Sequence, residues 1–496
     1  MVCRKRAMPS SSMPALPAIA ATIALGLALT ACSAVGPDYR APPPPPGRTY
    51  TREPQPATTV ATRGPFGAAQ RFDAANVVEY DWWRNFGSPK LDATVAEAMR
   101  NSPTLESATA SLDEAREIQA AQSGSTRIPT IGGRLGAARE EINGASVGQP
   151  RFPQTTYTLF NASVAVNYTF DLFGGNRRAL EALAAQVDYR RFELAGARVT
   201  LAGNVVTTAL AEAELSAQID ATQSMLARQR RQLEIARRAE RLGTGSHAAV
   251  LALRTTVEQT GATLPPLRNR LQRTTHQLAV LLGRPPGDAA VPRFAMSDFT
   301  LPARLPLVVP SELVRARPDV QASSALLHAA TAQYGVAVAA LYPQINLSSS
   351  LGSAALTTGA LFGPGSAVWS LAGSLAQPLF NAGLRSGARA AEASLQAVGA
   401  NYRQTVLQAL RDVADALRQL DADAEVLQRQ QAAYSSARRA GALVSRQYGL
   451  GVASYVQLLL AEQQIDQIHV GLIAARAARL ADSAALYQAM GGGAHP

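Results

Sequence analysis

The stretch from residue 384 to residue 420, LRSGARAAEASLQAVGANYRQTVLQALRDVADALRQL, decides the fold class of this chain. Its apolar and small residues recur at steps of three and four, which is the seam of a coiled coil. They are Leu384, Ala388, Ala391, Leu395, Val398, Tyr402, Val406, Leu410, Val413, Leu417 and Leu420. The sequence therefore predicts a very long helix from about Leu384 to Tyr448.

A second long helix is predicted from about Arg177 to Arg241. At a rise of 1.5 Å per residue, each of the two would span on the order of 95 Å. A glycine-containing turn follows each, and then a shorter helix, over residues 246–283 and 453–490, runs back antiparallel along it. Globular enzymes rarely contain helices of this length, so we predict a mainly α fold.

The two halves of the chain resemble one another, which indicates an internal duplication. We therefore divide the chain after residue 80 into a first repeat (81–283), a proline-rich connector (284–310) and a second repeat (311–496). Each repeat reads as helix, strand, strand, very long helix, tight turn and helix. The matching segments are NSPTL 101–105 with ARPDV 316–320, RIPTI 127–131 with LYPQI 341–345, DLF 171–173 with PLF 378–380, and LGTG 242–245 with YGLG 448–451.

The predicted strands alternate in a way that is typical of a membrane barrel. Strict alternation runs from residue 158 to 170, and weaker alternation follows over 345–351 and 369–375. Apolar-out, polar-in strands of about ten residues form transmembrane barrels. A half-buried hairpin of a soluble protein gives the same alternation. The barrel interpretation places Phe160, Val164, Val166 and Tyr168 against lipid.

Four strands per chain cannot close a barrel, and open sheet edges are not tolerated in lipid. Two chains would give eight strands, whose interior is filled by side chains, whereas three chains would give twelve strands and room for a pore. The sequence thus suggests a homotrimer with a 12-strand barrel, continued by a long barrel of helices.

The N-terminus resembles a bacterial lipoprotein signal over residues 1–31. Arg4, Lys5 and Arg6 precede an apolar stretch, and the segment LTACS at 29–33 resembles a lipoprotein processing site. Cys32 would carry acyl chains such as palmitate, which anchor a protein stably when more than one is attached. Ser33 after the cysteine favours the outer membrane. Residues 32–80, with five consecutive prolines inside 41–47, are predicted to be a tether.

Composition excludes several classes of protein. The chain has 496 residues, 47% of them apolar and 17% charged, which argues against intrinsic disorder. Only two cysteines are present, so a disulfide scaffold is excluded. No run of eighteen apolar residues occurs, so we expect no membrane-spanning helix. The net charge of +11, three of it from the signal, is scattered and favours solvated helix faces over a nucleic-acid surface.

The residues also argue against an enzyme. The five histidines are dispersed, and the chain has no HExxH motif, no phosphate-binding loop and no GxSxG elbow. We therefore expect no catalytic residue, no metal site and no cofactor.

Seven segments together resemble the TolC outer-membrane factor family, in particular its lipoprotein branch of OprM- and NodT-like proteins. They are GPDY 36–39, WWRNF 82–86, YTFDLFG 168–174, RPDV 317–320, ALYP 340–343, PLFNAG 378–383 and LYQAMGGG 486–493. The resemblance implies a TolC-like trimer in the outer membrane that extends into the periplasm. It also implies that a periplasmic adaptor and an inner-membrane transporter, of the RND type, deliver small molecules such as drugs or other toxic compounds to this exit duct.

The resemblance assigns roles to the two helical turns as the periplasmic tip and adaptor contact. The residues concerned are Arg241, Gly243, Thr244, Gly245, Tyr448, Gly449 and Gly451. Just beyond the second turn, many relatives carry aspartates that ring a constriction. Here Gln457 and Leu460 occupy the corresponding positions, so we expect a neutral iris with weaker cation preference.

Two other functions fit the sequence. A duct for type I protein secretion would share the fold, and a passive coiled-coil lipoprotein without a pore would share the helices. The repeated strands argue against the passive protein, and the lipoprotein form favours small-molecule efflux. Selection of the transported compound would reside in the transporter.

Overall fold

A computed structural model describes residues 34–43, 49–75, 78–143, 148 and 153–493. The protein is mainly helical, with some sheet, and divides into two compact units. Cys32 and the predicted signal peptide lie outside the described residues. The first unit contains Met1–Arg40, Arg116–Gln186 and Leu327–Val398, and the second contains Ala41–Ala115, Val187–Leu326 and Gly399–Pro496.

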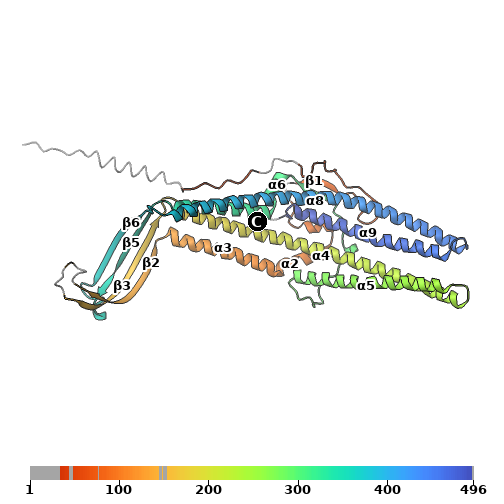
Figure 1. Cartoon of the computed structure of the whole chain (residues 1–496), viewed down its shortest axis with the longest axis horizontal. Coiled ribbons are helices and arrows are strands. Elements are labelled where there is room, and N and C mark those ends of the chain that lie inside the picture. Colours follow the sequence, from red (N-terminus) through yellow and green to blue (C-terminus); the bar gives the residue numbers. More distant parts are fainter. Residues whose placement is uncertain (1–33, 44–48, 76–77, 144–147, 149–152, 494–496) are drawn as a thin grey trace, which may run out of the picture. The chain divides into compact units, whose positions relative to one another are not determined.

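The first unit contains a four-stranded antiparallel sheet in the order β2-β3-β5-β6 (Figure 1). The strands are β2 (Thr130–Ile142), β3 (Thr155–Phe170), β5 (Gln344–Ala355) and β6 (Ala367–Ala376), with a short 3-10 turn η4 (Thr358–Ala360) between the last two. This sheet has the four strands that the two predicted strand pairs imply. Helices α3 (Pro103–Arg127) and α7 (Pro318–Ala339) lead into the two strand pairs.

Two very long helices leave the sheet, and each is followed by a return helix (Figure 1). They are α4 (Gly175–Arg241) and α8 (Ala382–Gly449), followed by α5 (His247–Leu281) and α9 (Tyr455–Ala489). The predicted bounds differ from these by one to a few residues. Both halves also have the same order of elements, since α3-β2-β3-α4-α5 corresponds to α7-β5-β6-α8-α9.

One window of eighteen residues in α4 is apolar enough, by length and composition, to cross a membrane. The sequence has no uninterrupted apolar run of that length, so the expectation that no helix spans a membrane stays a prediction. That window is 56% buried within the chain, which is the behaviour of a core helix. Alanine-rich packing surfaces raise the hydropathy of such a helix without making it a membrane span.

Aromatic residues form the core of the second unit. The short helix η1 (Trp82–Phe86) buries Trp82 and Phe86 completely, and the Trp82 ring stacks on that of Tyr487 with centroids 5.2 Å apart. Helix α2 (Pro89–Asn101) follows, and its N-cap Ser88 accepts a hydrogen bond from the amide of Leu91 at 3.3 Å. Buried aromatic rings of this size contribute a large share of core stability.

Part of the predicted tether and part of the predicted connector are folded together. Strand β1 (Arg71–Ala75), inside 32–80, pairs in parallel with β4 (Arg304–Val308), inside 284–310. Short helices η3 (Met296–Asp298) and α6 (Pro310–Ala316) flank β4. Proline-rich composition indicated a linker but carried no sign of this pairing, because the two strands are separated by more than two hundred residues.

A buried arginine of α9 binds the N-terminal segment that contains β1 and, through Gln70, the connector that contains β4. Arg479 is fully buried, and its Nη2 donates to Gln70 Oε1 at 2.8 Å and to Thr59 Oγ1 at 3.1 Å. The Gln70 amide in turn donates to Ser483 Oγ at 2.9 Å and to the carbonyl of Pro302 at 3.0 Å. A buried cation must be hydrogen-bonded to be tolerated, so this network holds the N-terminal segment and the connector on one helix.

The two helical reversals have the same construction. Gly243 and Gly451 both have positive φ, 72° and 75°. The amide of Thr244 donates to the backbone carbonyl of Ala239 at 2.9 Å. In the same way, the amide of Val452 donates to the backbone carbonyl of Gln447 at 2.9 Å. These bonds satisfy carbonyls that a helix end would otherwise leave open.

Two carboxyl groups face each other between α8 and α9. Burial raises the pKa of Asp482 to about 8, and a hydrogen bond with Asp423 acts in the same direction. Asp423 is buried and accepts a hydrogen bond from Gln419 Nε2 at 3.0 Å. Like charges this close cannot both ionise without cost.

We expect this pair to make the stability of the second unit depend on pH. The pKa of Asp482 is raised from 3.8 to about 8, so the unfolded chain releases this proton first as the pH rises. The free energy of unfolding should therefore fall between about pH 4 and about pH 8. Asp482→Asn should flatten this dependence in thermal unfolding followed by circular dichroism, whereas Asp415→Asn, at an exposed position on α8, should not.

We expect alanine at Gly451 to destabilise the second reversal by about 1 kcal/mol, because positive φ is unfavourable for a residue with a Cβ atom. Gly449 provides the matched control, since its φ is not positive and a Cβ there meets nothing within 4 Å. Gly449→Ala should be neutral or slightly stabilising. Chemical unfolding in mild detergent compares the two, and equal effects would show that φ is not the constraint.

Candidate functional site

The register of the sheet sorts its residues onto two faces. Residues directly opposite each other in an antiparallel pair point to the same face. Val164 lies opposite Gly133 and Leu351, and Leu351 lies opposite Trp369. The even-numbered residues of β3 therefore share a face with the odd-numbered residues of β2, β5 and β6.

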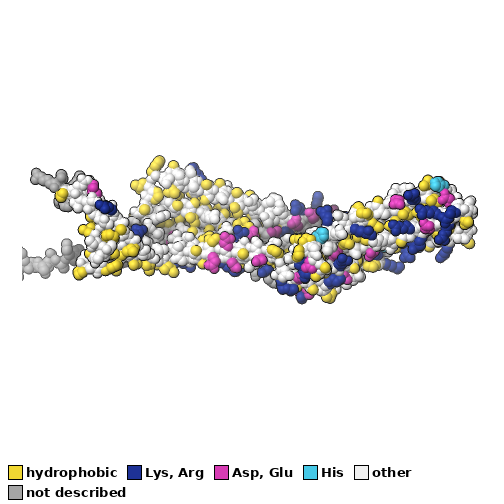
Figure 2. All heavy atoms as spheres, turned by 90° about the horizontal axis from the view of Figure 1, so that it is seen from below, with side chains coloured by type: hydrophobic (Ala, Val, Ile, Leu, Met, Phe, Trp, Pro, Cys, Tyr) yellow, Lys and Arg dark blue, Asp and Glu magenta, His cyan; other side chains and the backbone are white. Residues whose placement is uncertain are grey.

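This apolar face carries most of the large hydrophobic side chains of the sheet, and most of those are exposed. Trp369, for example, is 77% exposed. The four residues predicted to face lipid all lie on it, and Figure 2 shows hydrophobic side chains over the strand-bearing part of the molecule. Its members include Ile131, Leu135, Phe160, Val164, Val166, Tyr168, Phe170, Leu347, Leu351, Trp369, Leu371 and Leu375.

The opposite face is polar. Thr169 Oγ1 donates to Asn346 Oδ1 at 2.7 Å, and the hydroxyls of Ser350 and Ser370 are 2.8 Å apart. Asn161, Ser163, Asn167, Ser348 and Ser374 lie on the same face, where Val368 is an exposed apolar exception. One face of the sheet thus suits hydrocarbon and the other suits water.

The two outer strands leave one edge each without a partner strand. Within the described part of the chain, β2 pairs only with β3, and β6 pairs only with β5. The backbone N–H and C=O groups on these two outer edges are available to a further strand. Water or another chain must provide their hydrogen-bond partners.

The residues predicted at the periplasmic tip lie at the two helical reversals. Apolar side chains are exposed there: Leu450 is 80% exposed, and Leu242 and Val452 are similarly open. Figure 2 shows basic side chains gathered at the end of the molecule where α4 and α5 meet. The last two turns of α4 and their neighbours supply Arg230, Arg231, Arg237, Arg238 and Arg241. The tips therefore combine apolar contact area with positive charge.

The structure gives Gln457 a local role at the start of α9. The side-chain oxygen of Gln457 accepts a hydrogen bond from the backbone amide of Ser454 at 2.7 Å. The backbone amide of Gln457 donates to Ser454 Oγ at 3.3 Å. These two bonds form a capping box. Leu460 lies one turn further along and is exposed.

Leu460 borders a pocket of about 190 Å³ between α4, α5 and α9. Two polar contacts cross it, Arg228 with Asp466 and Gln232 with Glu462. Burial raises the pKa of both carboxyl groups, against the opposing effect of Arg228. These contacts could not be predicted from the sequence, because charged residues on separate helices give no signal of pairing.

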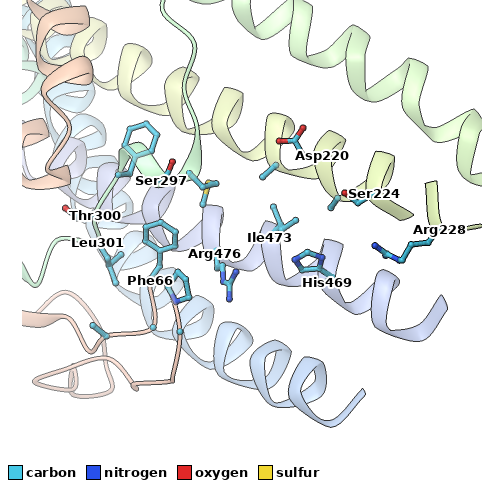
Figure 3. Close-up of a pocket in the computed structure, with 18 residues that line it drawn as sticks. Phe66, Asp220, Ser224, Arg228, Ser297, Thr300, Leu301, His469, Ile473 and Arg476 are labelled. Atoms are coloured by element: carbon cyan, nitrogen blue, oxygen red, sulfur yellow. The ribbon is translucent and has the colours of Figure 1, made fainter. Parts of the chain in front are cut away.

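A larger cavity of about 1000 Å³ lies in the second unit (Figure 3). Helix α4 lines it with Asp220, Ser224 and Arg228, α9 with His469, Ile473 and Arg476, and two loops with Phe66 and Leu301. Burial lowers the pKa of His469, whose ring stacks on that of Tyr434 with centroids 5.2 Å apart. Among the described residues, no group of three His, Cys, Asp or Glu side chains could hold a metal ion.

Comparison with known proteins agrees with this architecture. The sequence model of a family described as outer membrane efflux protein matches residues 94–284 and 309–492. These two matches fall in the two halves that share one order of elements.

Curated relatives match over most of their length. The chain is 30% identical over 416 residues to the pyoverdine export outer membrane protein OpmQ of Pseudomonas putida, covering 83% of this chain and 88% of the relative. It is 27% identical to the antibiotic efflux pump outer membrane protein ArpC of Pseudomonas putida, covering 95% of each.

Solved structures share the fold. The outer-membrane channel OprN superposes with a TM-score of 0.81 at 26% identity, over 93% of this chain and all of that chain. The matched family and its structural neighbours are channel proteins rather than enzymes. The chain therefore belongs to the outer membrane efflux protein family, and it is an outer-membrane exit duct for efflux that extends into the periplasm.

Proposed function

We propose that three copies of this chain pool their sheets into one 12-strand barrel with a water-filled interior. The observation that carries this proposal is the sheet itself, which combines an exposed apolar face, a polar face and two edges without partner strands. In lipid those edges must be paired, so β2 of one copy would pair with β6 of the next. Twelve strands leave room for a pore, whereas eight do not.

The long helices would continue this barrel into the periplasm as a helical tube. Helices α4 and α8 are 67 and 68 residues long, so each spans on the order of 100 Å. Small molecules would pass through the tube without chemical change, and the duct would have no catalytic role. The names of these relatives, which mention pyoverdine and antibiotics, support small-molecule cargo.

The partners we propose are a periplasmic adaptor and an inner-membrane transporter of the RND type. The adaptor would contact the two helical reversals, at Arg241, Gly243, Thr244, Gly245, Tyr448, Gly449 and Gly451. Exposed leucine and valine side chains next to a cluster of arginines support this contact. An adaptor surface with apolar and acidic groups would fit best.

Near the tip, Gln457 and Leu460 would form the constriction of the closed duct. Neither side chain carries charge, so the pore there would attract cations less than an acidic ring does. Cys32, acylated after cleavage of the signal, would anchor each chain to the outer membrane.

Imaging of the purified mature protein in mild detergent tests the assembly. We expect tapered rods with three-fold symmetry, because three chains would share one barrel. The rods should be longer than about 100 Å, because the long helices extend from that barrel. Negative-stain averages are sufficient to see both features. Compact particles of a single chain would contradict the trimeric barrel.

A pair of arginine substitutions tests which face of the sheet meets lipid. Leu371→Arg puts a charge on the apolar face of β6, where it should cost about 2–4 kcal/mol at the bilayer midplane. Ala372→Arg puts the same charge on the polar face, one residue away.

We expect Leu371→Arg to lower the amount of folded protein in isolated outer membranes severalfold and Ala372→Arg to leave it close to the parent. Equal losses in both variants would mean that the two faces do not differ in their contact with lipid.

A further inference from the structure

The segment Ala34–Tyr39, which we name the N-terminal clasp, is bound to the first unit by its backbone. The amide of Val35 donates to the carbonyl of Phe173 at 3.0 Å. Arg178 of α4 returns two bonds, from Nε to the carbonyl of Val35 at 3.3 Å and from Nη2 to that of Gly36 at 3.4 Å. The clasp therefore lies where β3 ends and α4 begins.

Arg178 is the centre of this contact. Its side chain is only 5% exposed, although that of its partner Asp38 is 85% exposed, and Nη2 approaches Asp38 Oδ1 to 2.6 Å. Nη1 donates to Glu181 Oε2 at 2.8 Å, and the other oxygen of Glu181 contacts His328 Nε2 at 2.9 Å. Burial opposes ionisation of Glu181, but the bonds from Arg178 and His328 outweigh it and lower the pKa of that carboxyl.

The ring of Tyr39 closes the clasp. It stacks on the imidazole of His328, with centroids 4.3 Å apart and planes 16° apart. His328 belongs to α7, so the clasp contacts one helix from each half of the chain. A contact of this kind fixes the segment from two sides.

Two glycines allow the backbones to meet. Gly36 has a φ of 88°, and a Cβ atom there would lie 2.7 Å from the Cα of Gly335 in α7. A Cβ atom on Gly174 would lie 2.4 Å from that of Ala34. Such distances exclude larger side chains without a backbone shift, so the segment fits a surface that is shaped for it.

The position of the clasp in the chain gives it a consequence for the lipid anchor. Cys32 precedes Ala34 by two residues, a span of at most about 7 Å of extended chain. The proline run comes after the clasp, so it connects the clasp to the second unit and does not lie between Cys32 and the sheet.

We propose that the clasp ties the lipid-bearing cysteine directly to the end of the sheet, with Arg178 as its positioning residue, so that the anchor and the strands enter the membrane as one unit. This inference rests on the proposed acylation of Cys32. The polyproline stretch then connects the two units in the chain and does not serve as a linker between the lipid and the protein.

Hydrogen exchange of the purified full-length protein in mild detergent, read by mass spectrometry, tests the clasp. Arg178→Ala should speed exchange of the Val35 amide at least about tenfold, because the segment loses its buried partner. Asp38→Asn, a change at an exposed side chain that cannot unfold the protein, should act in the same direction. Unchanged protection in both variants would overturn the proposal.

Arg190→Ala is the matched control. Arg190 lies on the same helix and pairs with Glu193 three residues on, at 2.7 Å, as Arg178 pairs with Glu181, but it does not contact the clasp. In the Arg190→Ala variant, the rate of hydrogen exchange near Val35 should equal that of the parent protein. Unchanged protection of β3 and β5, which belong to the same unit as the clasp, shows that the fold is intact in every variant.

Two six-residue Gly-Ser insertions test the link to the anchor. Inserted after Ser33, the spacer should lower outer-membrane assembly as much as Cys32→Ser does, and inserted after Pro43 it should leave assembly unchanged. Equal effects at both places would overturn the link. Mass spectrometry of Cys32 tests acylation separately, so an absent lipid would refute the proposed anchor without altering the exchange result.

Discussion

Backbone hydrogen bonding at the edges of one small sheet constrains most of this molecule. Strands β2 and β6 each have a single partner strand within the described chain, and one face of the sheet is apolar and exposed. In the proposed barrel this face would lie in hydrocarbon, which offers no donor or acceptor, so the two edges would need partners from other copies. On that proposal, the requirement for several copies follows from the sheet, and the helices that follow it would share the same symmetry.

The long helices meet a second constraint, because a helix of 67 or 68 residues needs packing partners along its length. Helices α4 and α8 have alanine-rich surfaces, and each is followed by a return helix. In the second unit, β1, β4 and the aromatic cluster around Trp82 add a conventional core. Arg479 of α9 holds the segment around Gln70 to this core, since losing Gln70 and Thr59 would leave a buried cation without these hydrogen bonds.

Sequence periodicity was sufficient for the elements but not for the contacts between distant segments. The helix from Ala382 to Gly449 was predicted to within a few residues, because steps of three and four run from Leu384 to Leu420 and a glycine-containing turn marks its end. The alternation in β3 likewise identified Phe160 and Val164 as members of one face. Patterns of this kind depend on neighbours in the chain, which a single sequence displays.

Contacts such as Arg178 with Asp38 or β1 with β4 join residues more than a hundred positions apart. Each partner looks like an ordinary surface or linker residue, so neither composition nor spacing reveals the pair. Part of the stretch predicted as a tether is folded against β4, and its composition gave no sign of this pairing. The glycines at 36 and 335 are consistent with a close approach of two backbones. The sequence alone does not show that these two glycines face each other.

Gln457 shows how one position can serve both the fold and the channel. As the third residue of α9 it completes a capping box with Ser454, a role for which glutamine and glutamate have the required length. Glutamine does this without adding a charge near the proposed constriction. The helix start at the tip is thereby stabilised by the same side chain that would leave the pore neutral, so changing its charge would alter the duct while changing its length would alter the helix.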